Sequence, residues 1–330
     1  MTLSNRITLV LAVALAPLCG ADEQALPNAK AVPLMQAIPL PRGAISIRRD
    51  GRELTRFHTD NTTQRRSFWF PVLTPSSERS LTRMGHPHDP VSHSHHNSVW
   101  ISHHDVAGVD FWGDHGKGKG QVRFRETHRL WDGVDAAGAE TVHDWVADGD
   151  TSPLLVETRR WEWRELGEGR GALLSIAIEA APPGGGDEVV FGETAFGLIG
   201  VRMAKTIGVR DGGGRILNSE GALNEKEVFR KPARWVDYSG PLRGDGTPAG
   251  IALLDHPRNP NHPAPFHVRE DGWMGVCLSF GGAVAVSPEK PLRARYGLWL
   301  HEGVASRDSV DAVWRQFAES PAPGVAGGEK

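Results

Sequence analysis

The chain has 330 residues and a formal net charge of −3, with 37 Lys and Arg against 40 Asp and Glu. This balance, without a basic stripe, argues against a nucleic-acid partner. Its 39 Gly and 23 Pro indicate many turns, and its two cysteines are too few for a disulfide framework.

The N-terminal segment has the pattern of a cleavable secretory signal over residues 1–21. Arg6 precedes an uncharged run over residues 7–18, and the small residues Gly20 and Ala21 follow. The run is shorter than the roughly 20 apolar residues of a membrane helix, and no later stretch reaches that length. We therefore expect a periplasmic or secreted protein without stable membrane insertion. A loose Ala- and Pro-rich leader is expected over residues 22–42.

Short apolar or alternating runs recur from residue 44 onward, separated by Gly- and Pro-rich turn signals. This spacing is typical of an all-β protein, and we predict a large antiparallel β sandwich forming a single domain over residues 43–320. Long amphipathic helices do not alternate with the runs, which argues against a parallel α/β fold. Examples of the predicted strands are residues 44–48, 67–73, 98–102, 121–125, 154–164, 172–180, 200–207, 250–254, 275–280, 283–287 and 293–301.

One short helix is predicted near the C-terminus. Ser306 is a suitable N-cap, and Asp308 lies near the positive end of the helix dipole. One apolar stripe follows at helical spacing, made of Val310, Val313, Trp314 and Phe317. Pro321 ends the helix, and we expect residues 321–330 to be a disordered tail.

Histidines are concentrated in one segment, since eight of the fifteen fall between His86 and His115. If residues 97–102 form a strand, its two-residue period places Val99 and Ile101 on the core face. His96, Ser98 and Trp100 then share the opposite face. An imidazole beside an indole suits a polar ring-shaped ligand, because one exchanges protons and the other stacks.

The same segment permits two other interpretations. The His-x-His pairs His86/His88 and His93/His95 each place two imidazoles on one strand face, as a metal site requires. No carboxylate completes such a set at close spacing, so a metal cofactor stays an open alternative. Individual histidines also satisfy ordinary loop hydrogen bonds.

Polar groups also gather at predicted strand ends and loops in the second half of the chain. The residues concerned are Asn218, Glu220, Trp235, Asp237, His256, Asn259, His267, Arg269, His301 and Glu302. Alternation places Phe266 and Val268 inward, with His267 and Arg269 outward. Each of these residues also has a structural interpretation, as a turn cap, an ion-pair partner or a solvated strand face.

The order of these motifs resembles the DUF6807 family of secreted bacterial proteins, often labelled "PmoA-like". The motifs are His-x-His-His-x-Ser-x-Trp, Asp-Val-x-Gly-Val-Asp-Phe-Trp, Phe-Gly-Glu-Thr, Asn-Ser-Glu-Gly, Ala-Arg-Trp-Val-Asp-Tyr-Ser-Gly, Asp-His-Pro-Arg-Asn-Pro and Phe-His-Val-Arg, from about Phe68 to Gly303. The label refers to an integral membrane subunit of methane monooxygenase, which does not suit this chain.

The resemblance implies a galactose-mutarotase-like β supersandwich associated with sugar catabolism. It maps the family's His-rich motif onto His93, His95, His96 and Trp100. It maps the later polar motifs onto Asn218, Glu220, Trp235, Asp237, His256, Asn259, His267 and Arg269.

We therefore expect an exported carbohydrate-active protein, and an acid/base enzyme of epimerase, lyase or hydrolase type rather than a passive binder. Glu302 or Asp237 is the expected base, His96 or His267 the expected acid, and Arg269 orients hydroxyls. The expected substrate-binding residues are His93, His95, Trp100, His103, Asn218, Glu220, Trp235, His256 and Asn259. The alternatives are a non-catalytic carbohydrate-binding protein and a His-ligated metalloprotein. These interpretations depend on one spatial expectation, that the His-rich segment and the polar residues of the second half of the chain line a common cavity.

Overall fold

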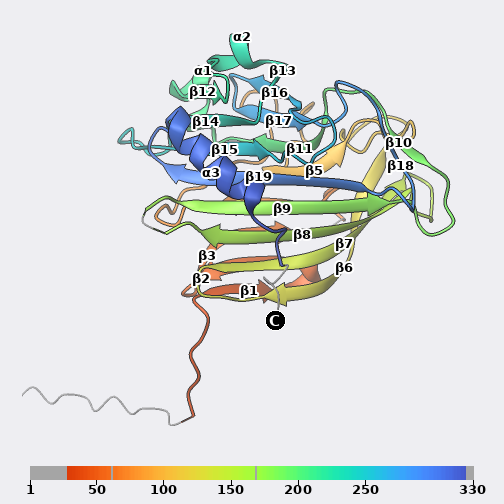
Figure 1. Ribbon diagram of the computed structural model, residues 1–330, viewed down its shortest axis with the longest axis horizontal. Coiled ribbons are helices and arrows are strands. Elements are labelled where there is room, and N and C mark those ends of the chain that lie inside the picture. Colours follow the sequence, from red (N-terminus) through yellow and green to blue (C-terminus); the bar gives the residue numbers. More distant parts are fainter. Residues whose placement is uncertain (1–27, 61, 168, 325–330) are drawn as a thin grey trace, which may run out of the picture. The chain divides into compact units, whose positions relative to one another are not determined.

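Strand-forming runs dominate the chain, and they assemble into two large antiparallel sheets (Figure 1). The computed structural model describes residues 28–60, 62–167 and 169–324, so the expected signal over residues 1–21 lies outside the described residues. The described residues from Pro33 onward form one compact unit. The predicted all-β antiparallel sandwich with a short C-terminal helix is confirmed.

The first sheet has nine strands, and its neighbours come from distant parts of the chain. In spatial order they are β1 (Met35–Pro39), β2 (Ile45–Arg49), β3 (Arg52–His58), β4 (Phe68–Val72), β5 (Val99–His103), β11 (Gly197–Arg202), β17 (Trp273–Cys277), β16 (Pro265–Arg269) and β13 (Lys231–Pro232). The centre of this sheet therefore combines the first, middle and last thirds of the sequence.

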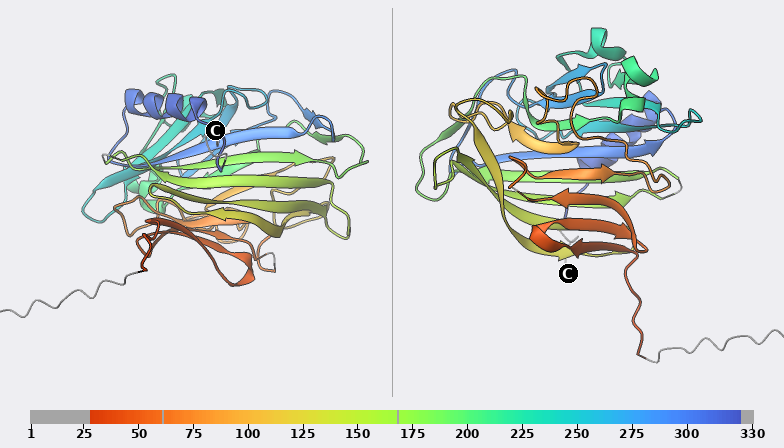
Figure 2. Two further views of the ribbon diagram at one scale, coloured as in Figure 1. Left: turned by 60° about the horizontal axis from the view of Figure 1, so that its bottom comes forward. Right: turned by 180° about the vertical axis from the view of Figure 1, so that it is seen from behind.

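The second sheet has eight strands and longer hairpins. In spatial order they are β12 (Arg215–Asn218), β14 (Trp235–Pro241), β15 (Pro248–Asp255), β19 (Leu292–Glu302), β9 (Ala172–Ala181), β8 (Leu155–Glu165), β7 (Ala136–Ala147) and β6 (Gly120–Trp131). A small separate ladder joins β10 (Val189–Phe191) to β18 (Val284–Val286). The two large sheets form the layers that Figure 2 shows.

One continuous hydrophobic core fills the space between the sheets. Ile101 of β5 and Ile199 of β11 enter it from the nine-stranded sheet, while Trp161 and Leu174 enter it from the eight-stranded sheet. Because side chains alternate along a strand, the neighbours of these residues point away from the core. The outward face of the nine-stranded sheet is therefore free to carry a different cluster of side chains.

Short helices occur at loops and at the C-terminal end. They are α1 (Val209–Gly212), α2 (Asn224–Val228), α3 (Arg307–Glu319) and the 3-10 turns Pro41–Gly43 and Lys205–Ile207. The predicted helix is confirmed as α3, with Ser306 as its N-cap accepting from the Ser309 N–H. Its apolar stripe packs on Trp235 and Trp299 of the eight-stranded sheet. Within the described residues, no helix is long and apolar enough to cross a membrane.

The leader expected over residues 22–42 needs a correction, because its end forms β1. Met35 and Ala37 are buried on one side of this strand, which pairs with β2. Two buried residues between prolines are too short a pattern to detect in the sequence. Of the expected tail, residues 321–324 are described and contain neither helix nor strand, whereas 325–330 lie outside the described residues.

A row of small and large residues crosses the outward face of the nine-stranded sheet. Trp100 of β5, Gly200 of β11, Gly275 of β17 and His267 of β16 are direct cross-strand partners in that order. A Cβ atom on Gly200 would lie 2.6 Å from the Trp100 ring. The glycines therefore let indole rings lie close to the sheet.

Replacing Gly200 with alanine is expected to destabilise the protein by roughly 1–3 kcal/mol, because the added methyl overpacks the Trp100 ring. The midpoint of urea unfolding measures this loss. Gly244→Ala is the matched control, since no atom lies within 4 Å of a Cβ at Gly244. Equal midpoints for the two variants would contradict the assigned role of Gly200.

Candidate functional site

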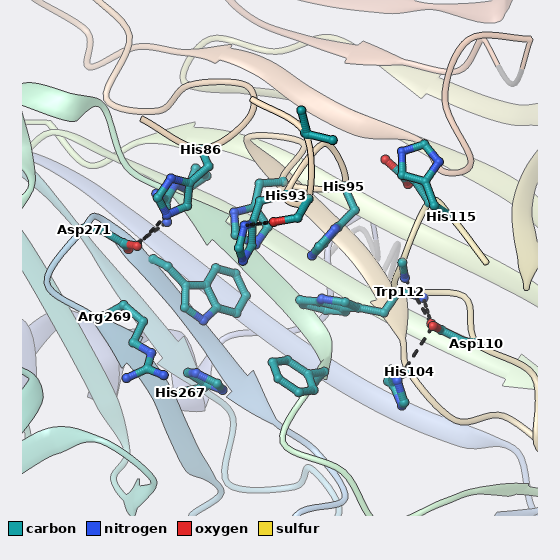
Figure 3. Close-up of a pocket in the computed structure, with 18 of the residues that line it drawn as sticks. His86, His93, His95, His104, Asp110, Trp112, His115, His267, Arg269 and Asp271 are labelled. Carbon is teal, nitrogen blue, oxygen red and sulfur yellow. Dashed lines mark hydrogen bonds and ion pairs between the residues drawn. The ribbon is translucent and has the colours of Figure 1, made fainter. Parts of the chain in front are cut away.

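A cavity of about 820 Å³ opens on the outward face of the nine-stranded sheet (Figure 3). Strands β11, β16 and β17 supply one side of its lining, including Arg202, His267 and Trp273. The loops before and after β5 supply the other side. Seven histidines line it: His86, His93, His95, His96, His104, His115 and His267. The cavity thus joins the His-rich segment to the last third of the chain.

Three indoles and the His96 ring form an aromatic cluster on this face. The rings of His96, Trp100 and Trp273 lie near-parallel, with centroids 5.4–5.6 Å apart. The Trp112 ring is tilted against Trp100 at 5.2 Å. Only 4% of Trp112 and of Trp273 is exposed, so a ligand meets the indoles along a narrow strip. The aromatic cluster therefore shapes the floor and positions His96.

Burial keeps three of the lining imidazoles uncharged at neutral pH. Desolvation lowers the pKa of His95 to about 4, helped by the positive charge of Arg66. Desolvation likewise lowers the pKa of His267 to about 4, with Arg269 contributing. The pKa of His96 is lowered further still, first by desolvation and then by His95. A neutral imidazole both donates and accepts a hydrogen bond, as proton transfer to or from a hydroxyl requires.

Two of these imidazoles also carry an unused polar atom. The Nδ1 atoms of His96 and His267 are buried and have no hydrogen-bond partner among the described residues. A buried polar atom without a partner is costly, and such atoms concentrate where a ligand or water completes the bonding. These two histidines are therefore the best-placed candidates for contact with a ligand.

His86 is held differently, by bonds to both of its ring nitrogens. Its Nδ1 accepts from the backbone N–H groups of His88 and Asp89, each at 3.0 Å. Its Nε2 consequently carries the proton and donates to Asp271 Oδ2 at 2.7 Å. With both nitrogens engaged, His86 fastens the His-rich loop to the β16–β17 turn.

Asp271 is the centre of this connection. Its other oxygen accepts from Arg202 Nη1 at 2.9 Å, and the Arg202 side chain is fully buried. Burial alone would raise the pKa of Asp271, but the charge of Arg202 and the hydrogen bond from His86 outweigh it and lower the pKa. Asp271 is therefore ionised at neutral pH and balances a buried guanidinium.

The other lining carboxylates are also paired with cations. Asp110 binds Lys119, and Glu225 of α2 binds Arg269. Asp114 accepts from the buried Arg66 at 2.8 Å. Among the described lining residues, each carboxylate therefore has its own cation, and the imidazoles are the titratable groups left for chemistry.

Because these buried histidines are uncharged in the folded state, we expect the free energy of unfolding to decrease in acid. The unfolded state has histidine pKa values of about 6.5, whereas those of folded His95 and His267 are about 4. Between these values the unfolded state binds more protons, so the free energy of unfolding falls as pH drops from about 6.5 to about 4. The loss is at most about 3 kcal/mol per histidine. Below pH 4 these two groups add no further loss.

Urea unfolding at pH 7, 5.5 and 4.5 measures this dependence. His267→Gln should flatten part of the slope, because glutamine does not titrate. His128→Gln is the matched control, since His128 is a half-exposed residue of β6. A wild-type stability that stays constant over this range would refute the assignment.

Five residues expected in the site do line the cavity: His93, His95, His96, His267 and Arg269. Trp100 lies beneath it, fully buried against His96. The alternation predicted around β5 is confirmed from Val99 onward, where the strand begins: Val99 and Ile101 enter the core, and Trp100 lies on the opposite face. The alternation predicted for β16 is confirmed as well, with Phe266 and Val268 in the core. Local periodicity was sufficient here because it fixes which face a side chain occupies.

The structure does not bring the two expected bases to the cavity. Asp237 belongs to β14 of the other sheet and is fully buried, with Oδ1 2.8 Å from His301 Nε2. Glu302 ends β19 and accepts hydrogen bonds from the hydroxyls of Thr74 and Ser76. Strand periodicity assigns a face but not a sheet, so the sequence could not separate these carboxylates from the cavity.

The remaining expected residues also lie outside the cavity lining and have structural bonds. Asn218 Oδ1 caps a turn by accepting from the backbone N–H groups of Glu220 and Ala222. His103 Nε2 lies 2.9 Å from Ser279 Oγ. Glu220 is exposed beside this cap.

Three others support α3 or the loop next to it. Trp235 Nε1 donates to Asp311 of α3 at 2.8 Å, and His256 Nε2 donates to the Ala318 carbonyl at 3.2 Å. Asn259 Oδ1 accepts from the Arg295 N–H at 2.6 Å. These motifs therefore hold the C-terminal helix against the eight-stranded sheet.

Sequence reasoning missed Arg202, Asp271 and Trp273. Arg202 lies on the same strand face as Gly200, because the two residues are separated by two positions in β11. The two-residue period of a strand is therefore a signal that could have identified Arg202. Asp271 lies in the Glu-Asp-Gly turn after Arg269, where a turn-forming role is the ordinary expectation. Trp273 follows that turn and lies on the same face as Gly275.

The described residues do not provide a set of ligands for the metal site that was considered as an alternative. In the part of the chain that the structure describes, no group of three or more His, Cys, Asp or Glu side chains is placed to hold a metal ion. Cys277 is buried, and desolvation raises the pKa of its thiol to about 12, as expected for an inert residue.

The model of a family described as "Family of unknown function (DUF6807)" matches residues 44–315. This range contains every residue that lines the cavity. No curated protein matches the chain.

Proposed function

Because the chain belongs to the DUF6807 family, whose function is unknown, we propose its function from the cavity: it binds a carbohydrate and transfers protons at that ligand through uncharged imidazoles. One observation carries the proposal. His95, His96 and His267 are kept neutral in a cavity whose described carboxylates are all engaged by cations. Proton transfer then falls to imidazole rather than to a carboxylate pair.

The roles of individual residues follow from their surroundings. Trp273 lies between His96, at 5.4 Å, and His267, at 6.0 Å, measured between ring centroids. A sugar ring resting against the exposed strip of Trp273 would have an imidazole on each side. His267 accepts a hydroxyl proton, and His96 or His95 donates one. Arg269 orients hydroxyls at the same edge.

The volume and polarity of the cavity support a small or medium-sized polar ligand. Ligand pockets of proteins span about 300–1,000 Å³, and this cavity has about 820 Å³. Its lining combines an aromatic strip with many hydrogen-bonding groups, which matches the apolar ring faces and hydroxyl edges of a sugar.

A thermal-shift screen against mono- and oligosaccharides tests the proposal. A ligand that binds only the folded state raises the melting temperature, and we expect this for at least one sugar class. The shift should be lost in His267→Ala and kept in His128→Ala, whose histidine lies on strand β6 of the other sheet. Failure of every sugar in the panel to raise the melting temperature would refute carbohydrate binding.

A non-catalytic carbohydrate-binding protein is the second candidate. The pairing of each described lining carboxylate with a cation favours it, because no free carboxylic acid is left as a proton donor. NMR spectra of the bound sugar, followed over time with the protein, distinguish the two candidates. New or interconverting sugar signals support an enzyme, and unchanged signals support a binder.

We also propose that the protein is exported. Support comes from the charged, apolar and small-residue pattern of residues 1–21. N-terminal sequencing of protein recovered from the periplasm or medium tests this. Recovery of the intact N-terminus from the cytoplasm alone would contradict it.

A further inference from the structure

The described lining of the cavity has four Lys and Arg side chains and four carboxylates, but one of the cations has no carboxylate partner. Four carboxylates line it, and each already binds a cation: Asp110 with Lys119, Asp114 with Arg66, Glu225 with Arg269, and Asp271 with Arg202. Arg66 lies outside the lining and neutralises Asp114, so the fourth lining cation, Arg210, forms no ion pair with the described residues. The internal charges are therefore matched, and one guanidinium remains.

Buried donors add to this surplus. Arg202 is fully buried and bonds Asp271 through Nη1 alone. Its Nε and Nη2 groups are buried and have no hydrogen-bond partner among the described residues. Unused buried donors favour a ligand rich in acceptors, because each buried N–H without a partner costs free energy. A group that carries negative charge is the strongest acceptor of this kind.

The position of Arg210 is fixed by the backbone of α1. Its N–H donates to the Glu270 carbonyl at 2.9 Å, which attaches α1 to the β16–β17 turn between Arg269 and Asp271. The Tyr238 hydroxyl reinforces this attachment, since it accepts from the Val209 N–H at 3.1 Å. Arg210 and Arg269 both line the cavity, and they come from backbone segments that this hydrogen bond joins.

We propose that the ligand is an acidic sugar, and that its carboxylate binds between Arg210 and Arg269. This inference rests on the proposed carbohydrate binding and narrows it to one substrate class. The planar guanidinium matches a carboxylate in a two-bond geometry. The hydroxyl groups of the same sugar then face His267 and His96. A sugar sulfate ester carries the same single negative charge as a sugar carboxylate, and the experiment below distinguishes the two groups.

Calorimetric titration with matched pairs tests the proposal. The ligands are glucuronate against glucose, galacturonate against galactose, and glucose 6-sulfate as the sulfate arm. We expect each uronate to bind about tenfold to a hundredfold more tightly than its neutral partner. Arg210→Gln should reduce that advantage, because only Arg269 then remains to bind the carboxylate. Arg243→Gln is the control, because Arg243 is an exposed arginine in the turn between β14 and β15, outside the cavity lining.

The outcomes separate this inference from the proposed function. Equal affinities for uronates and neutral sugars would refute the acidic-sugar class and leave carbohydrate binding intact. An advantage that Arg210→Gln leaves undiminished, or that Arg243→Gln reduces equally, would refute the assigned position. Tighter binding of the sulfate than of the uronates would also refute the carboxylate. If no sugar of either kind binds, the proposed function itself fails.

Discussion

Asp271→Ala is expected to lower the free energy of unfolding by about 3 kcal/mol, because removing one partner of a buried ion pair leaves the other charge uncompensated. The uncompensated charge would be that of Arg202, whose side chain is fully buried. The same substitution removes the acceptor of His86 and releases the His-rich loop from the β16–β17 turn. Chemical denaturation at pH 7 measures the loss.

The pH dependence of this loss has a defined sign. The pKa of folded Asp271 is lowered from that of an unfolded aspartate, about 3.9. Its ionised form therefore stabilises the protein fully above about pH 4, and this contribution is lost as pH falls through the lowered folded-state pKa. The wild type and the variant should accordingly converge in stability in strong acid.

Asp211→Ala is the matched control for Asp271→Ala. Asp211 also accepts from a histidine, at 2.8 Å, but its partner His88 is 44% exposed. Exposed ion pairs contribute about 0–1 kcal/mol. If the two variants lost the same stability, the buried connection between Asp271 and Arg202 would not be the cause.

His267→Ala is expected to reduce kcat/KM on a confirmed carbohydrate substrate by roughly 10²–10⁴-fold, the usual contribution of a general acid or base. The imidazole lies in the cavity and is uncharged at neutral pH, because its pKa is about 4. If its neutral form accepts the proton, the wild-type rate should fall as pH drops through about 4. A rate measurement between pH 3.5 and 8 records both effects.

His267→Gln distinguishes proton transfer from simple packing. Glutamine keeps a hydrogen-bonding side chain but does not titrate, so it should restore folding and part of the binding without restoring the rate. The matched His128→Ala variant, with a surface histidine of β6 replaced, should keep the full rate. Full activity of His267→Gln would exclude His267 from proton transfer.

Local patterns in the sequence were sufficient for the class of fold and for part of the site. Alternation around Trp100 and around His267 assigned their faces correctly, because side chains point to opposite sides of a strand in turn. The N-cap and the apolar stripe of α3 could likewise be predicted, because both depend on residues that are close in the sequence. The clustering of histidines in the sequence indicated the loop before β5, which lines the cavity.

Only the tertiary structure decided which of the polar residues meet. β5, β11 and β17 are adjacent, although they come from distant parts of the chain, and their order places His96 beside Trp273. Asp237 and Glu302 have equally suggestive local patterns, yet their strands belong to the other sheet. The physical reason is that periodicity depends on neighbouring residues, whereas sheet membership depends on long-range strand pairing.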